Sequence, residues 1–294
     1  MKNMLSMKGT GYALRLLLLF ASLLFLPVAG QAASDDAARR FQQGLSAYKE
    51  GDYATALRYW RPLAEQGHAL AQNQLGVMYA NGRGVPQDFK QAVAWYRKAA
   101  EQGVALAQNN LGGMYHEGQG VPQDFKQAAA WFRKAAEQGV AGAQNNLGVM
   151  YERGLGVPQD FKEAVAWFRK AAEQGHAGAQ NNLGVSYARG RGVPQDYKQA
   201  EAWFRKAAEQ GLAVAQNNLG SMYERGLGVV SNKVLAYALY NLSAATDPSE
   251  ENEATRNRER LSEELTSAEI AAAQALTREL MRPGQFGRAL GTWW

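Results

Sequence analysis

The sequence contains no cysteine in its 294 residues. Disulfide bonds, thiolate nucleophiles, cysteine metal ligands and a lipid anchor on cysteine are therefore excluded. Histidine is scarce as well, with three residues in the whole chain. His68 and His176 share one repeat position at which other copies have Val or Leu, and His116 stands alone. No catalytic residue, cofactor site or metal site is predicted, and we expect a protein that is not an enzyme.

A strong charge of either sign is also missing once the N-terminus is set apart. The chain has 32 Lys and Arg against 27 Asp and Glu, but three of the basic residues and none of the acidic ones lie in residues 1–32. The remainder has 29 basic and 27 acidic residues, a net charge of +2. This balance gives little electrostatic reason to bind nucleic acid, and nucleic acid is not predicted as a partner.

The longest apolar run is too short to span a membrane. Leu16–Leu26 has about a dozen residues, whereas a membrane span needs roughly 20. The run follows a cationic start with Lys2 and Lys8, and small residues around Ala32 resemble a cleavage site. The pattern predicts a signal peptide over residues 1–32, cleaved after Ala32, and a periplasmic or secreted protein without membrane insertion. A signal anchor is the alternative.

Internal repetition is what the sequence has in abundance. A segment of 36 residues recurs almost unchanged in four copies, and a fifth copy keeps its first helix and turn. The copies begin at Ala69, Ala105, Ala141, Ala177 and Ala213. A period in this range indicates a solenoid, in which each unit buries its apolar face against its neighbours.

The first half of each copy predicts a helix, here described for the copy that begins at Ala105. Ala107, Leu111 and Tyr115 fall on one face of that helix. Gly112 lies off this stripe, where its missing side chain would let a neighbouring helix approach closely. The segment Gly118–Pro122 then predicts a turn, because glycine permits positive φ and proline ends a helix.

The second half of each copy predicts another helix. Asp124 is the expected N-cap, and Gln127 stands three residues later, the spacing of a capping box. Apolar residues from Phe125 to Ala136 recur at helical spacing, and Gly139 is placed to end the helix. One such hairpin is too small to bury its own apolar face, so the copies are expected to stack.

The repeat pattern A-x-x-x-L-G-x-x-Y-x-x-G-x-G-V-x-x-D-x-x-x-A-x-x-W-x-x-K-A-A-x-x-G, as in residues 107–139, resembles the Sel1-like repeat family, which is related to the tetratricopeptide repeat. The resemblance implies an all-α, right-handed α/α superhelical solenoid of about six to seven helix hairpins with C-terminal capping helices. It also implies that the first helices line a concave surface.

The ends of the chain depart from the repeat pattern. Residues 33–68 predict a first repeat of the tetratricopeptide type with a shorter turn, and the Sel1-like repeats run over residues 69–248. Residues 249–282 predict two capping helices, the second of which starts with a Thr266–Glu269 capping box. Residues 283–294 predict a flexible tail.

Three other features recur once per copy and invite functional interpretations. The G-x-G pairs follow helices instead of strands, which favours turns over phosphate binding. Arg-Lys pairs stack along the second helices and predict a solvated outer face, with an anion-binding track as the alternative. One tryptophan per copy predicts core between repeats, with a ligand platform as the alternative. These residues are Arg97-Lys98, Arg133-Lys134, Arg169-Lys170 and Arg205-Lys206, and Trp95, Trp131, Trp167 and Trp203.

Two columns of amide side chains on the first helices are the candidate binding residues. The first column is Asn73, Asn109, Asn145, Asn181 and Asn217, and the second is Gln74, Asn110, Asn146, Asn182 and Asn218. Relative to Ala107, the first column lies about 200° around the helix and the second about 300°. We therefore expect the first column to point away from the apolar stripe and to bind the backbone of an extended partner, as the resemblance implies. The second column lies at the margin of the stripe and either binds or fixes the stacking of the repeats.

The positions that differ between copies are candidates for specificity. Gly113 and His116 lie on roughly the same side as Asn109, one to two turns further along the helix. Other copies have Val77, Val149, Val185 and Ser221 at the first of these positions, and Ala80, Glu152, Ala188 and Glu224 at the second.

The sequence and the resemblance together favour a periplasmic or secreted scaffold that binds a protein or peptide through its concave surface, in envelope signalling, complex assembly or host interaction. A polysaccharide-binding accessory of export is the alternative. A hydrolase acting on β-lactams or the cell wall is less favoured, because the relatives linked to such substrates rely on paired cysteines and this chain has none.

Overall fold

A computed structural model describes residues 34–247 and 252–291 of the chain. Every regular element in those residues is a helix, and no strand occurs there. The predicted signal peptide lies outside the described residues. The chain divides into two compact units, one up to Val104 and one from Ala105 onward, and each is described by itself.

In its described residues, from 34 onward, the first unit contains four helices. A helix over residues 34–49 is followed by α2 (Tyr53–Glu65), α3 (Ala69–Asn81) and α4 (Phe89–Glu101). Its core is centred on Trp60, which is fully buried and donates its indole N–H to the carbonyl of Phe41 at 3.1 Å. Residues 34–65 therefore form a helix pair that packs on α3, as a first repeat should.

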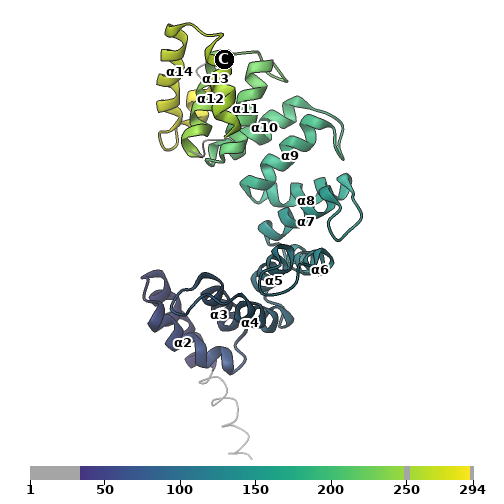
Figure 1. The fold of residues 1–294 in the computed structure, drawn as a ribbon, viewed down its shortest axis with the longest axis vertical. Helices are drawn as coiled ribbons and strands as arrows, with labels where there is room; N and C mark the ends of the chain where they lie inside the picture. Colours follow the sequence, from purple (N-terminus) through teal and green to yellow (C-terminus); the bar gives the residue numbers. More distant parts are fainter. Residues whose placement is uncertain (1–33, 248–251, 292–294) are drawn as a thin grey trace, which may run out of the picture. The chain divides into compact units, whose positions relative to one another are not determined.

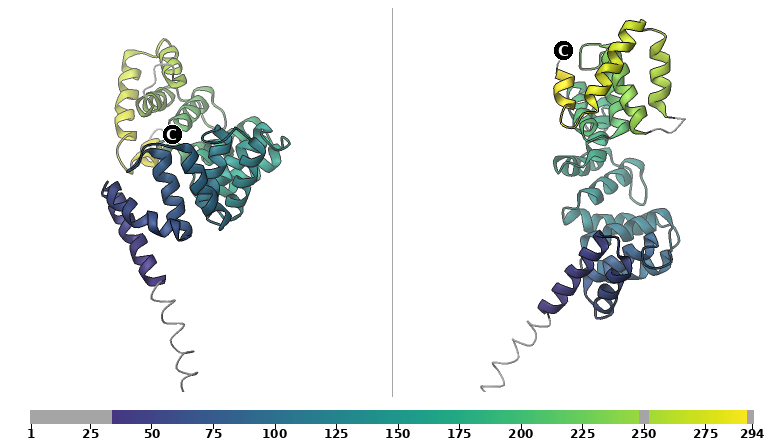
Figure 2. Two further views of the ribbon diagram at one scale, coloured as in Figure 1. Left: turned by 60° about the horizontal axis from the view of Figure 1, so that its bottom comes forward. Right: turned by 90° about the vertical axis from the view of Figure 1, so that its left-hand side faces the viewer.

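The second unit continues the helix pairs in chain order (Figures 1 and 2). Its helices are α5 (Ala105–Glu117), α6 (Phe125–Glu137), α7 (Ala141–Arg153), α8 (Phe161–Glu173), α9 (Ala177–Arg189), α10 (Tyr197–Glu209), α11 (Ala213–Arg225), α12 (Lys233–Thr246), α13 (Glu253–Ser262), α14 (Ser267–Leu280) and α15 (Phe286–Gly291). Each first helix packs against the second helix of its own pair, and that second helix packs against the next first helix. The prediction of an all-α architecture of stacked hairpins is confirmed.

The first helices begin where the repeat predicts, at Ala69, Ala105, Ala141, Ala177 and Ala213. The turn that follows α7 shows why its glycines recur. Gly154 ends α7 in the left-handed conformation with φ 68°. Gly156 also has a positive φ, and a Cβ placed on it would lie 2.1 Å from the carbonyl oxygen of Phe125. The G-x-G pair is therefore a turn that packs against the backbone of the preceding repeat.

The second helices are capped as predicted by the aspartate that precedes them. The Asp124 carboxylate accepts hydrogen bonds from the backbone N–H groups of Lys126 and Gln127 at 2.9 and 3.0 Å. A reciprocal capping box, with both partners bonded, is found at Thr266 and Glu269. Side-chain caps of this kind contribute about 1 kcal/mol each.

A glycine on each first helix packs directly under an aromatic ring of its second helix. In α7, a Cβ on Gly148 would lie 2.6 Å from the Phe168 ring, closer than real contacts allow. The same relation holds for Gly76 with Tyr96, Gly112 with Phe132, Gly184 with Phe204 and Gly220 with Tyr240. The predicted close approach at Gly112 is therefore correct, and it explains why glycine recurs inside helices that it would otherwise weaken.

The C-terminal segment is more ordered than the sequence analysis expects. Helices α13 and α14 both pack against α12. In the segment predicted to be a flexible tail, Phe286–Gly291 instead form helix α15, and its Phe286 and Leu290 are buried in the same core. The prediction failed there because the Pro and Gly before α15 suggested a loop, whereas apolar residues after them reach the core.

Candidate functional site

The two amide columns meet between neighbouring first helices and form a ladder of hydrogen bonds. In each rung the second-column Asn of one helix donates its Nδ2–H to the Oδ1 of the first-column Asn on the preceding first helix. The rungs are Asn146 to Asn109 at 3.4 Å, Asn182 to Asn145 at 3.0 Å and Asn218 to Asn181 at 2.9 Å. We call this row the amide ladder. It joins α5, α7, α9 and α11 in sequence.

The orientation predicted for the first column is wrong. Asn73, Asn181 and Asn217 are buried, with exposed fractions of 5%, 8% and 5%, and Asn109 and Asn145 are half-buried. On a single helix the first column points away from the apolar stripe. In the structure the neighbouring first helix covers that side, so the column is buried or half-buried. The ladder shows that these amides bond neighbouring first helices to each other, and their contribution to stacking and their role in binding a partner both stay predictions.

A third polar column was not predicted from the sequence, because its glutamines resemble ordinary surface residues. It consists of Gln72, Gln108, Gln144, Gln180 and Gln216, all buried. Gln180 illustrates its bonds: its Nε2–H donates to the carbonyl of Ala172 at 3.2 Å, and its Oε1 accepts from Gln210 at 2.8 Å. The side chain thus joins the ends of two successive second helices. A glutamine directly beside the buried alanine of each copy was the available signal.

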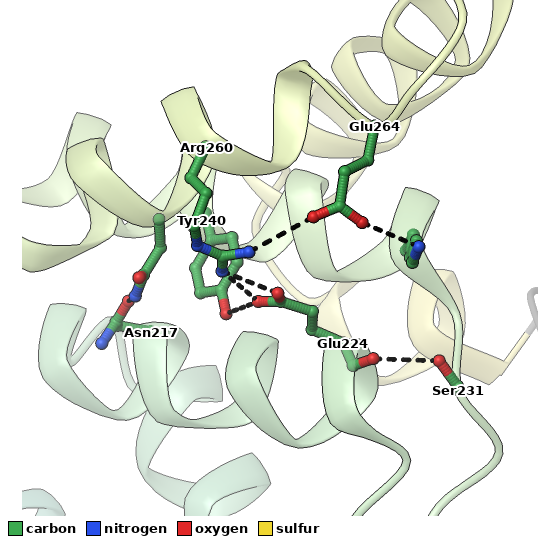
Figure 3. Close-up of polar contacts among 8 residues, drawn as sticks. Asn217, Glu224, Ser231, Tyr240, Arg260 and Glu264 are labelled. Atoms are coloured by element: carbon green, nitrogen blue, oxygen red, sulfur yellow. Dashed lines mark hydrogen bonds and ion pairs between the residues drawn. The ribbon is translucent and has the colours of Figure 1, made fainter.

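The amide ladder ends at the first capping helix. Asn257 of α13 donates to Asn217 at 3.0 Å, so α13 occupies the place of a further first helix. Beside this rung, Glu224 accepts from the Tyr240 hydroxyl at 2.7 Å and from Arg260 at 2.8 Å (Figure 3). Burial raises the pKa of Tyr240, and the bond to Glu224 raises it further. The cap is therefore attached through a polar network as well as through apolar contacts.

The basic and aromatic columns of the second helices are engaged with one another. Lys134 lies over the Trp131 ring at 4.1 Å, and the same pairing recurs in the other copies. The tryptophans are half-buried. Trp167 packs against the core that α6 and α7 form between two repeats, and Trp203 packs against the core that α8 and α9 form. Arg133 donates to the Tyr151 hydroxyl of the next repeat at 2.7 Å. These contacts support the interpretation of the tryptophans as inter-repeat core.

The histidines serve the backbone or pack against rings. His68 and His176 are N-caps, and their Nδ1 atoms accept the backbone N–H of Ala71 and Ala179 at 3.2 and 3.1 Å. His116 packs edge-on against Phe125 with ring centroids 5.4 Å apart. In the part of the chain that the structure describes, no group of three or more His, Asp and Glu side chains is placed to hold a metal ion.

One pocket opens on the first-helix face, between α5 and α7 beside the first rung of the ladder. Its volume is about 210 Å³. Phe132, Val149 and Met150 supply apolar lining, while Asn146, His116 and Glu117 supply polar lining next to Gly113. The pocket is thus lined by both residues, Gly113 and His116, that are predicted from the sequence to determine specificity.

Comparison with known proteins identifies the repeat. The family model described as "Sel1 repeat" matches residues 32–68, 69–104, 105–140, 141–176, 177–212 and 213–245. It therefore also covers the segment for which a tetratricopeptide-type repeat is expected. A search of curated protein sequences gives no match.

Solved structures with the same kind of repeat are similar to the chain. A Sel1 repeat protein from Oxalobacter formigenes is 36% identical with a TM-score of 0.64, over 70% of this chain and 85% of that one. A protective antigen of uropathogenic Escherichia coli with an SLR fold is 31% identical with a TM-score of 0.41, over 87% of this chain and 70% of that one. An immunity protein from Pseudomonas aeruginosa is 19% identical with a TM-score of 0.50, over 71% of this chain and 84% of that one, and shows the fold alone.

Proposed function

Because the chain belongs to the Sel1 repeat family, we propose that it is a non-catalytic scaffold that binds a protein partner along the face of its first helices. The observation that carries this proposal is that two sets of positions on those helices differ in burial and in how far they vary between copies. Buried positions are repeated from copy to copy and hold the stack together, whereas the positions at their C-terminal ends differ and line a pocket at Gly113. A surface whose buried residues are repeated from copy to copy and whose accessible residues differ is suited to recognition of one particular partner.

The variable positions are free to serve recognition because different copies fold with different residues there. One column has Ala80, His116, Glu152, Ala188 and Glu224, and the next has Asn81, Glu117, Arg153, Arg189 and Arg225. Glu224 is used by the cap network, but Glu152 and Arg153 line an open depression between neighbouring turns. The proposal therefore places the partner on α5, α7 and α9 beside the ladder, where Asn146 is the ladder residue that also lines the pocket.

The test exchanges variable residues for those that other copies already contain. The variant His116→Ala, Glu152→Ala, Arg153→Asn uses residues found at the same positions in sister copies, so its thermal stability should stay close to that of the parent. We expect affinity capture of the partner by the purified protein to fall by at least about tenfold. The matched control is Glu163→Gln on the exposed side of α8, where sister copies have Gln. Equal capture by the folded triple variant would contradict the proposal.

We further propose that the scaffold acts outside the cytoplasm, in the periplasm or the medium. The support is the cationic start and short apolar run in residues 1–32. Among the described residues, no helix is long and apolar enough to cross a membrane. Cell fractionation with N-terminal sequencing of the exported protein tests the idea. A mature N-terminus at Ala33 is expected, and an uncleaved cytoplasmic protein would overturn it.

A further inference from the structure

We propose that the pocket at Gly113 binds a long cationic side chain, arginine or lysine, of the partner segment. This inference rests on the proposed function and adds the chemistry of the residue that the scaffold recognises. It is carried by the origin of the pocket, by its lining and by the charge at its edge.

The pocket exists because one copy departs from the repeat. Gly113 stands where the copies on both sides have Val77 and Val149, and a Cβ placed on Gly113 would meet no atom within 4 Å. The space is therefore open to an incoming group and is not filled by a neighbouring side chain. At about 210 Å³ it has room for one side chain, since pockets for whole small-molecule ligands typically measure roughly 300–1,000 Å³.

The lining combines an apolar part with hydrogen-bond acceptors. Phe132 and Met150 are almost fully buried, with exposed fractions of 3% and 1%, so the apolar part is fixed by the core. Glu117, Asn146 and His116 are the polar residues of the same lining, and the side chains of the first two contain a carboxylate and an amide oxygen that can accept hydrogen bonds. Asn146 is itself held by its bond to Asn109. An arginine or lysine side chain matches this combination, because its methylene stem covers apolar surface while its charged end reaches polar groups.

The charge of the edge selects a cation. Glu117 is exposed, and the equivalent position is Asn81 in the preceding copy and Arg153, Arg189 and Arg225 in the following ones. The copy with glycine in place of the valine is thus the copy that carries a carboxylate at this position, whereas the copy with Ser221 in place of the valine carries Arg225. A leucine would use only the apolar part of the pocket, and an aspartate or glutamate would be repelled by Glu117.

The experiment uses three short peptides that differ at one residue, acetyl-Gly-Ala-X-Ala-Gly-amide with X as Arg, Leu or Glu. Binding to the purified protein is followed through the ¹³C-methyl NMR signal of Met150. The Arg peptide should bind at least about fivefold more tightly than the Leu peptide, and the Glu peptide should bind least. Tighter or equal binding of the Leu peptide, or binding of none of them, would overturn the proposal.

Two variants separate the contribution of the open space at Gly113 from that of the Glu117 charge, and the folding of each can be checked by circular dichroism. Gly113→Val introduces the residue of the sister copies and should abolish binding of the Arg peptide. Glu117→Gln keeps the size of the side chain and should reduce Arg binding to the level of the Leu peptide. Unchanged binding of the Arg peptide by either folded variant would overturn the proposal that the pocket binds a cationic side chain. The proposed scaffold function would still be supported in that case if the triple variant lost capture of the partner.

Discussion

At the residue scale, the repeat depends on positions where a side chain is absent or held in one charge state. The glycine under each aromatic ring shows the first case, because packing overrides the low helix propensity of glycine. The N-cap residue His176 shows the second case. Only an unprotonated Nδ1 can accept a backbone N–H, so the cap bond depends on the charge of the ring.

Replacement of Gly148 by Ala should destabilise the protein by about 1–3 kcal/mol, because the added methyl group forces the Phe168 ring out of its place. Urea unfolding measures the change. The control lies on the same helix: Gly142→Ala meets no atom within 4 Å and should be neutral or slightly stabilising. Equal effects of the two substitutions would show that helix propensity, and not packing against Phe168, determines the change in stability.

Acid should weaken the cap at His176. Burial lowers the pKa of His176 below its ordinary value of 6.5. As the pH falls below that value the unfolded chain takes up a proton first, so the cap's contribution is complete above pH 6.5 and is lost as the pH falls through the folded pKa. The variant His176→Val copies the residue found at Val140 and should show less loss of stability between pH 7.5 and 5.5. Parallel stability curves for parent and variant would argue against this.

At the scale of helices, the stack is held by two rows of amides that each join one pair to the next. The buried glutamines join successive second helices, and the amide ladder joins successive first helices. Buried amides left without partners cost about 1–3 kcal/mol each. Both rows therefore penalise any slip between repeats that apolar contacts alone would tolerate.

A double-mutant cycle tests the rung between Asn182 and Asn145, which are 3.0 Å apart. Each single replacement by Ala should destabilise the protein, and the coupling between the two should be about 0.5–1.5 kcal/mol. The pair Asn109 and Asn182, which belong to different rungs, serves as the control and should be additive. Additivity of the bonded pair would mean that the ladder contributes nothing to stacking.

The sequence predicted those helix features that depend on neighbours along the chain. The start of α7 at Ala141, the Asp124 cap and the close approach at Gly112 all follow from periodicity and local geometry. The exposure of Asn181 and the bonds of Gln180 were missed, because they depend on the adjacent repeat, which a projection of one helix leaves out. The pocket was indicated only by the substitution at Gly113, since its volume depends on three helices together.

At the scale of the whole molecule, the stability of the unit from Ala105 onward should be close to a sum over its repeats, because each helix pair there packs against the pairs next to it in the chain. The capping helices α13 and α14 cover the last pair. Their Asn257 completes the ladder and Leu276 and Leu280 enter the same core as α12. The number of repeats can therefore change while the capping helices α13 and α14 stay the same.

Deletion of residues 141–176 removes one complete period and should leave a folded protein of lower stability, with Asn182 bonded to Asn109. Circular dichroism should show the same helix content per residue, and the urea dependence of unfolding should decrease in proportion to the shorter chain. A deletion of residues 141–172, which is four residues out of period, should unfold or aggregate. If both deletions behaved alike, the period would not govern the stacking.

The final rung also bears on how such a chain can evolve. Asn257 bonds to a first-column asparagine that every full copy contains, so this contact of the cap can form with whichever copy stands last. Gain or loss of a copy through unequal recombination would then yield a folded protein at once. Selection would be left to act on the few residues, such as Gly113 and Glu117, that make one copy differ from another.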